Sequence, residues 1–316
     1  MRKIKYIENI SEITAGTRGA SLGIDAMRVA AYKRQSNFFT DNDFVKIKDE
    51  NDQLLSPLKF TNAKRIEGLN KVFDYVGDEV KSTLGNKEFP FVLAADHGSA
   101  GGTIAGIKAA FPDKRLGVVW IDAHADLHSP YTTPSGNMHG MPLATAIADD
   151  NVESKINDLS ETEKGLWEEL KGKYGIVPKI KSEDLFFIAV RDTEKPEDEL
   201  MARRNIKNYE VTEVNERGCE AVVSEILEKL SDCDIIYVSF DVDSMDSEIS
   251  VGTGTPVPNG LSASEASQIL NLFAQSPKLV CMEMVEINPC LDNKGNVMAE
   301  TSLDILEKVS EEIKKN

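Results

Sequence analysis

Short apolar runs alternate with amphipathic stretches along most of the chain. The runs predict buried β-strands, and apolar residues at helical spacing predict helices between them. The predicted strands are residues 3–7, 89–95, 116–121, 185–190, 234–240 and 279–285. The predicted helices are residues 21–34, 64–84, 99–109, 143–149, 213–230, the tail from 302, and two stretches that follow capping-box patterns at Ser160 and Ser262. Residues 35–62 and 171–184 are polar and are expected to be irregular connections.

This alternation predicts an α/β fold with a mostly parallel sheet covered by helices on both faces. In such sheets the ligand site lies beyond the carboxyl ends of the strands. Four of the predicted strands end close to a histidine or an acid, namely His97, Asp122, Asp241 and Glu286. We therefore expect these side chains to converge. No internal repeat or domain boundary is apparent, so residues 1–316 are expected to form one domain.

The segment after the third predicted strand carries Asp122, His124 and Asp126 at alternate positions. On an extended backbone this spacing points the three side chains the same way. Asp241 and Asp243 repeat the pattern after another strand, although such a pair alone is more often a helix cap or a turn. The chain has four histidines, all between residues 97 and 139, which favours a functional site over four separate structural histidines.

Two histidines and four aspartates form the candidate metal ligands, namely His97, Asp122, His124, Asp126, Asp241 and Asp243. This set is too large for one catalytic zinc ion, which takes three protein ligands. It suits two ions about 3.5 Å apart with bridging carboxylates, and its many oxygens favour Mn²⁺. A water between two such ions becomes a hydroxide nucleophile, so we expect metal-assisted hydrolysis at carbon or phosphorus. The ligand motifs contain no Arg or Lys, which favours a cationic electrophile over a phosphate.

The charge and composition of the chain limit the kinds of molecule that it is expected to bind. The formal net charge of −17 argues against nucleic acid, which requires a basic surface, and an acidic cleft attracts a cationic substrate. The four cysteines form no CxxC pair, which indicates reduced thiols in a cytosolic protein. The first residues lack the apolar core of a signal peptide, and no apolar run is long enough to span a membrane. We expect a cytoplasmic protein that acts on a small molecule.

Four segments resemble those of the ureohydrolases, the family of arginases, agmatinases and formiminoglutamases. They are Asp96-His-Gly-Ser99, Asp122-Ala-His-Ala-Asp126, Ser239-Phe-Asp-Val-Asp-Ser-Met-Asp246 with Gly252-Thr-Gly-Thr-Pro256, and Met284-Val-Glu-Ile-Asn-Pro289. Their order and spacing match from about residue 90 to the C-terminus, and Ser135-Gly-Asn-Met-His-Gly140 resembles the substrate loop of arginases in particular. The resemblance implies a three-layer α/β/α sandwich, two Mn²⁺ per subunit and a homo-oligomer, either a trimer or a hexamer.

The resemblance also implies two groups of metal ligands that share two bridging aspartates. The first ion is held by His97, Asp122, Asp126 and Asp241. The second ion is held by Asp122, His124, Asp241 and Asp243. The residues expected in catalysis itself are Asp126, His139, which carries a proton to the leaving amine, and Glu286, which pairs with the guanidinium.

The substrate contacts that the resemblance implies come from several loops. Thr255 lines the pocket beside Glu286. The residues around the α-carboxylate of an amino-acid substrate are Thr133, Ser135 and Asn137. The residues that face its α-amino group are Glu194 and Glu197. His128 is either a further substrate contact or a structural loop residue.

Five positions depart from the family pattern. Ala94-Ala95 replaces two glycines, and Ser247 replaces a proline. His128 stands where arginases usually carry an Asn, and Glu194 stands where the family usually carries an Asp. The metal set is complete, so His128 and Glu194 bear on recognition of the amino acid and not on hydrolysis.

The sequence thus predicts a binuclear manganese hydrolase that cleaves the guanidinium group of L-arginine to L-ornithine and urea, with a metal-bridging hydroxide as nucleophile. Two alternatives stay open. The first is a formiminoglutamase or another hydrolase of guanidino acids, which the substrate loop at residues 135–140 argues against. The second is a non-catalytic binding protein of the same fold, which the complete ligand set and His139 argue against.

Overall fold

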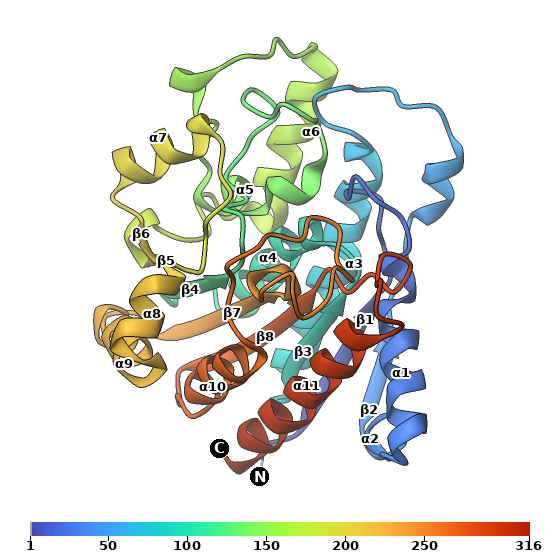
Figure 1. The fold of residues 1–316 in the computed structure, drawn as a ribbon. Helices are drawn as coiled ribbons and strands as arrows, with labels where there is room; N and C mark the ends of the chain where they lie inside the picture. Colours follow the sequence, from blue (N-terminus) through green and yellow to red (C-terminus); the bar gives the residue numbers. More distant parts are fainter. Residues whose placement is uncertain (1) are drawn as a thin grey trace.

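An eight-stranded sheet lies at the centre of the computed structural model, which describes residues 2–316 (Figure 1). Its strands are β1 Ile4–Asn9, β2 Asp43–Lys46, β3 Phe89–Ala94, β4 Leu116–Ile121, β5 Leu185–Ile188, β6 Lys207–Tyr209, β7 Ile235–Asp241 and β8 Leu279–Val285. They follow the order β2-β1-β3-β8-β7-β4-β5-β6, and every neighbouring pair is parallel. The prediction of a mostly parallel sheet is confirmed.

Helices cover both faces of this sheet, as expected for parallel strands that are buried on both sides. The helices are α1 Gly23–Arg34, α2 Phe38–Asp41, α3 Ile66–Gly85, α4 Ala100–Ala110, α5 Pro142–Ile147, α6 Glu161–Lys171, α7 Lys195–Arg204, α8 Val211–Arg217, α9 Cys219–Lys229, α10 Ala263–Ala274 and α11 Val297–Lys315. Along β4, Val119 and Ile121 pack with α1, α9, α10 and α11, whereas Val118 and Trp120 pack with α3, α4 and α5 on the opposite face. Figure 1 shows α10 and α11 in front of the sheet and α3 and α4 behind it. The result is the expected three-layer α/β/α arrangement.

The capping boxes and most of the long elements lie where the sequence pattern predicts them. Ser160 accepts a hydrogen bond from the backbone of Glu163 at the start of α6, and Ser262 does the same with Glu265 at the start of α10. Each glutamate in turn accepts from the backbone N–H of its serine, which satisfies amide groups that the helix leaves unpaired.

Three predictions of secondary structure are wrong. Residues 35–62 are not irregular throughout, because they include α2 and β2, and the pattern also missed α7 and β6. The strands β2 and β6 lie at the sheet edges, where partly exposed side chains interrupt the apolar run. Residues 213–230 form two helices instead of one, because Gly218 takes φ 82° and ψ 151°, a conformation open almost only to glycine. The last helix begins at Val297 and not at 302.

The topology brings the four functional strand ends together. The strands β3, β8, β7 and β4 are consecutive neighbours in the sheet. The side chains that follow or end them are His97, Glu286, Asp241 and Asp122, and all four are buried. The ends of these strands therefore build one site at the carboxyl edge of the sheet, where ligands bind in open α/β folds.

Within residues 2–316, no helix combines the length and the apolar character that crossing a bilayer requires.

Candidate active site

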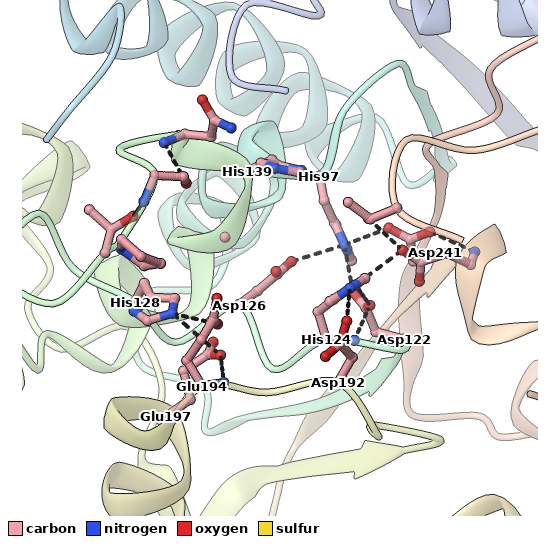
Figure 2. Close-up of a pocket in the computed structure, with 17 residues that line it drawn as sticks. His97, Asp122, His124, Asp126, His128, His139, Asp192, Glu194, Glu197 and Asp241 are labelled. Carbon is pink, nitrogen blue, oxygen red and sulfur yellow. Dashed lines mark hydrogen bonds and ion pairs between the residues drawn. The ribbon is translucent and has the colours of Figure 1, made fainter. Parts of the chain in front are cut away.

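A cavity of about 280 Å³ opens at the carboxyl edge of the central strands (Figure 2). All the predicted site residues line it except Glu286. The cavity walls come from the loops after β3, β4, β5 and β7, which are far apart in the sequence. The structure therefore brings together the residues that the sequence motifs single out.

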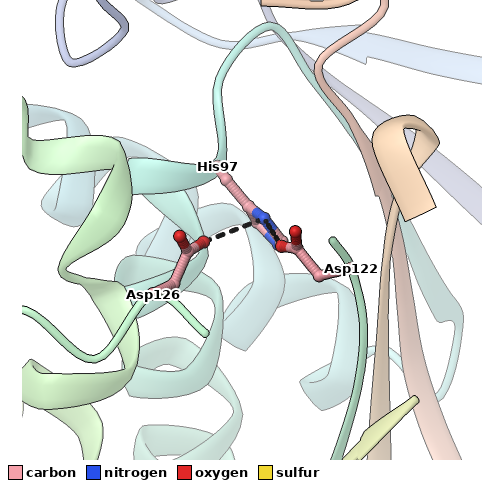
Figure 3. Close-up of side chains that lie close together, drawn as sticks. All are labelled: His97, Asp122 and Asp126. Carbon is pink, nitrogen blue, oxygen red and sulfur yellow. Dashed lines mark ion pairs between the residues drawn. The ribbon is translucent and has the colours of Figure 1, made fainter. Parts of the chain in front are cut away.

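The first ligand group surrounds the imidazole of His97 (Figure 3). Its Nδ1 lies 2.9 Å from Asp122 Oδ2, 3.1 Å from Asp126 Oδ2 and 3.3 Å from Asp241 Oδ2. This nitrogen is buried and has no hydrogen-bond partner. A buried nitrogen that faces three carboxylate oxygens without a hydrogen bond is the geometry expected of a metal ligand.

The second ligand group surrounds His124. Its Nδ1 lies 3.1 Å from Asp243 Oδ2 and 3.4 Å from Asp122 Oδ1. Asp122 thus turns one carboxylate oxygen toward His97 and the other toward His124. Asp241 differs, because its Oδ2 faces His97 while its Oδ1 accepts a hydrogen bond from the backbone N–H of Asp243 at 2.8 Å and not from a second histidine.

These clusters concentrate negative charge in a buried space. Burial opposes a charge on His97, but the surrounding carboxylates raise its pKa well above the ordinary value. The pKa of His124 is raised in the same way, because the charges and hydrogen bonds of Asp243 and Asp122 together outweigh burial. Burial and neighbouring carboxylates together raise the pKa of Asp241 well above its usual range. The site therefore requires positive charge, and divalent cations fit this requirement because they displace the imidazole protons and pair with the carboxylates.

Trp120 supports the first ligand group from within the sheet. Its indole ring stacks on the imidazole of His97, with centroids 4.0 Å apart and planes 5° apart. Its Nε1 donates a hydrogen bond to Asp122 Oδ2 at 3.0 Å. Asp126 completes the group from a backbone with φ 51°, a strained conformation that is typical of functional sites. These contacts fix the directions of the side chains without a ligand.

His139 and Glu286 form a pair behind the ligand groups. Glu286 Oε1 accepts a hydrogen bond from the backbone N–H of His97 at 3.0 Å and lies 3.3 Å from His139 Nδ1. Burial lowers the pKa of His139, but the hydrogen bond and charge of Glu286 outweigh it and raise the pKa to about 9. Glu286 is buried and its Oε1 contacts two residues of the cavity wall, His97 and His139, whereas its Oε2 lies 3.4 Å from the position of a Cβ built on Gly254, next to Thr255.

The substrate loop is held by its own side chains. Thr133 Oγ1 accepts hydrogen bonds from the backbone N–H groups of Ser135 at 3.3 Å and Gly136 at 2.9 Å, and Ser135 Oγ accepts from Asn137 N–H at 3.1 Å. Lys64 Nζ donates to Asn137 Oδ1 at 3.0 Å from a neighbouring segment. The loop thereby presents hydroxyl and amide groups to the outer part of the cavity.

His128 and Glu194, the two predicted substrate-contact residues that depart from the family pattern, contact each other. His128 Nε2 lies 2.9 Å from Glu194 Oε2 and 3.5 Å from Glu197 Oε2, while its Nδ1 lies 3.0 Å from Thr132 Oγ1. Burial opposes a charge on His128, but the hydrogen bond with Glu194 and the charges of Glu197 and Glu194 together outweigh it and raise the pKa. Burial raises the pKa of Glu197 to about 7. His128 is therefore held in place by a loop hydroxyl and an acidic pair, and it still lines the cavity.

Sequence reasoning missed several residues of the site. Asp192 lines the cavity and lies 3.7 Å from His124 Nε2, and Pro134 and Gly140 also line it. The signal for Asp192 was present, because it follows a strand end as the metal ligands do. Trp120 gave no such signal, because an indole inside an apolar run is indistinguishable from a core residue.

Comparison with known proteins gives matches along nearly the whole chain. The sequence profile of the Arginase family matches residues 9–310. The arginase of Bacillus subtilis (strain 168) is 31% identical over 309 residues, which cover 97% of each chain. The crystal structure of arginase from Bacillus cereus superposes with a TM-score of 0.81 at 29% identity, with 98% of each chain covered. The Entamoeba histolytica arginase in complex with L-ornithine gives a TM-score of 0.82 at 25% identity and the same coverage.

Fold, site and relatives together define an arginase-like ureohydrolase enzyme. The chain belongs to the arginase family.

Proposed function

We propose that this protein hydrolyses L-arginine to L-ornithine and urea with the help of two Mn²⁺ ions. The observation that supports this most directly is the position of Asp122, whose two carboxylate oxygens face two different histidines at 2.9 and 3.4 Å. A site for one metal ion would not require the two oxygens of one carboxylate to face two different histidines. Shared carboxylates are typical of two-metal hydrolases.

The ligand assignment follows the two groups and their shared aspartates. His97 and Asp126 would hold the first ion, and His124 and Asp243 would hold the second. Asp122 and Asp241 would be shared by both ions. When bound, the two ions supply an acidified water as the nucleophile. Mn²⁺ suits this set because oxygen ligands predominate and only two imidazoles take part.

The chain's own residues position the substrate and move its protons. Glu286 offers its free Oε2 to the guanidinium beside Thr255, and its Oε1 holds His139. A protonated His139 donates its proton to the amine that leaves as ornithine. Its raised pKa keeps it charged at neutral pH, which favours this role. Asp126, a member of the first ligand group, also raises the pKa of His139 through its charge and so stabilises the charge that His139 carries.

At the outer end of the cavity, we assign the α-carboxylate to the hydroxyl and amide groups of Thr133, Ser135 and Asn137. The α-ammonium pairs with Glu194 and Glu197, which are the acids on that side. His128 lies between the two ends of this recognition surface, and we propose that it contacts the substrate while it orients Glu194. The E. histolytica arginase structure with bound L-ornithine supports an amino-acid product in a site of this fold.

Assays of urea and formamide release by the Mn²⁺-reconstituted protein test this function. The substrates are L-arginine, agmatine, 4-guanidinobutyrate and formiminoglutamate. We expect L-arginine to give urea with the highest kcat/KM. Preferred formamide release from formiminoglutamate, or preference for another guanidino compound, would establish the alternative hydrolase. Lack of reaction with every compound by metal-loaded protein would instead support a binding protein. Asp241→Ala, which removes a bridge, is the control that should abolish activity.

A further inference from the structure

Polar side chains run along one face of the buried strand β7. Tyr237, Ser239 and Asp241 occupy alternate positions and point to the face that α3 and α4 cover. Glu283 on β8 is the register partner of Ser239, and its exposed fraction is 0%. Asp241 has a role as a metal ligand in the proposed function, whereas Tyr237 and Glu283 have none. A fully buried carboxylate costs free energy unless it is hydrogen-bonded, so its contacts are informative.

These contacts connect Glu283 to the first ligand group. His97 Nε2 lies 2.7 Å from Ser239 Oγ, on the side of the ring opposite the three aspartates. Tyr237 donates its hydroxyl hydrogen to Glu283 Oε2 at 2.5 Å. Burial raises the pKa of Tyr237, and a hydrogen bond with Ser239 partly offsets that rise. The contacts thus run from His97 through Ser239 and Tyr237 to Glu283.

The direction of this chain follows from the chemistry of its two ends. A metal ion on Nδ1 of His97 requires that the hydrogen of the neutral imidazole sits on Nε2, which then donates to Ser239. The hydroxyl of Ser239 donates onward to Tyr237, and Tyr237 donates to Glu283. Because Nε2 would donate to Ser239, the hydroxyl hydrogen of Ser239 is left for Tyr237 and that of Tyr237 for Glu283 Oε2, so the neutral form of His97 with a metal on Nδ1 would set the direction of every hydrogen bond in the chain.

We propose that Glu283 is a positioning residue that acts through Tyr237 and Ser239 to keep His97 Nδ1 free of a proton and directed at the first ion. The inference rests on the proposed function, because it takes His97 as a metal ligand. In many metal sites a carboxylate accepts a hydrogen bond directly from the metal-bound histidine. Here two hydroxyl groups, those of Ser239 and Tyr237, lie between His97 and Glu283. The imidazole of His124 has no such support, since its Nε2 lies 3.7 Å from the exposed Asp192. The effect of Glu283 is therefore confined to one of the two ions.

Equilibrium dialysis of the full chain against Mn²⁺, followed by metal analysis, tests this role. The wild-type protein should bind two ions. Tyr237→Phe and Glu283→Gln should each raise the Kd of one ion by about tenfold to a hundredfold and leave the other Kd unchanged. Tyr209→Phe is the matched control, because it removes a hydrogen bond from another buried tyrosine to a glutamate, from Tyr209 on the edge strand β6 to the partly exposed Glu225 at 2.9 Å. It should bind both ions as the wild type does.

A selective loss separates positioning from general damage to the fold. Tyr237→Phe that binds both ions normally, or that loses both equally, overturns the inference. If Glu283→Gln fails to fold, Tyr237→Phe and Ser239→Ala still test the inference. Both substitutions interrupt the same chain of hydrogen bonds, so their effects on the Kd of the first ion should not add in the double variant. The proposed function is tested separately. Two bound ions without urea release refute the function and leave the positioning role intact, whereas urea release with unchanged binding in Tyr237→Phe refutes only the role of Glu283.

Discussion

Two glutamates from one turn stand at the outer end of the cavity and differ in exposure. The Glu194 side chain is 55% exposed and paired with His128, whereas Glu197 is 4% exposed. Glu194→Gln removes the exposed charge and should weaken binding of any substrate with an α-ammonium. Hydrogen bonds to charged groups contribute about 1.5–3 kcal/mol, so kcat/KM for L-arginine should fall by roughly tenfold to a hundredfold. Because Glu194 does not belong to either ligand group, kcat should change little.

A substrate without the amino group provides the control for this variant. 4-Guanidinobutyrate keeps the carboxylate and the guanidinium, so its kcat/KM should be the same with wild type and Glu194→Gln. Steady-state kinetics with both substrates measure the difference. Equal losses for the two substrates would show that Glu194 supports the loop and does not recognise the α-ammonium.

Among single residues, the sequence allowed prediction of those whose charge is unusual at the end of a buried strand. Asp122, His124 and Asp126 stood out because charged residues at alternate positions after an apolar run have few structural uses. The contact between His128 and Glu194 was not predictable, because it joins two loops that are adjacent only in the folded chain. The buried position of Glu286 behind His139 was hidden for the same reason.

Among the connecting loops, residues 133–137 depend on one glycine. Gly136 has φ 74°, and a Cβ built there would lie 1.8 Å from the carbonyl oxygen of Thr61. Gly136→Ala should therefore displace the loop, since neither backbone can yield without breaking the hydrogen bond from Lys64 N–H to Gly136 O. We expect kcat/KM for L-arginine to fall more than about tenfold, as misplacement of a substrate-positioning group commonly does. Mn²⁺ stoichiometry should not change, because the loop contains no metal ligand.

Gly165→Ala is the matched control for that loop variant. Gly165 lies in α6, is exposed, and has no atom within 4 Å of a built Cβ. Alanine in a helix interior is favoured over glycine by about 0.5–1 kcal/mol, so this variant should unfold at a slightly higher temperature with unchanged kinetics. Thermal unfolding and urea release measured on both variants separate the two effects. Normal arginine kinetics in Gly136→Ala would contradict a positioning role for the loop.

Strands that are fully buried were easier to predict from the sequence than strands that are partly exposed. The central strands β3, β4, β7 and β8 are buried along their whole length, so their apolar runs were plain in the sequence. The edge strands β2 and β6 have mixed burial and gave no run to detect. The break at Gly218 was missed because the apolar periodicity continues through it. The parallel direction of the strands followed from the alternation of strands and helices, whereas the order of the strands in the sheet did not.

For the molecule as a whole, the net charge of −17 and the four buried aspartates of the two ligand groups act in the same direction. Both oppose folding through repulsion, and the aspartates do so most strongly because they are desolvated. Salt screens the surface charges but reaches the buried ones much less. Only cations that enter the site relieve that part of the repulsion. Stability should therefore respond to Mn²⁺ in a way that ionic strength does not reproduce.

Removal of metal by a chelator should lower the unfolding temperature, and added Mn²⁺ should restore it. Binding to the folded state alone stabilises by about 2.7 kcal/mol for each independent site when free Mn²⁺ is 100 times the Kd. Calorimetry at matched ionic strength measures the shift, with NaCl as the control for screening. Asp243→Asn should keep the response to NaCl and lose part of the response to Mn²⁺, because only one ligand group is damaged. The same Mn²⁺ shift in Asp243→Asn and wild type would contradict the assignment of the second ion, since Asp243 Oδ2 is the oxygen nearest to His124 Nδ1 among the described contacts.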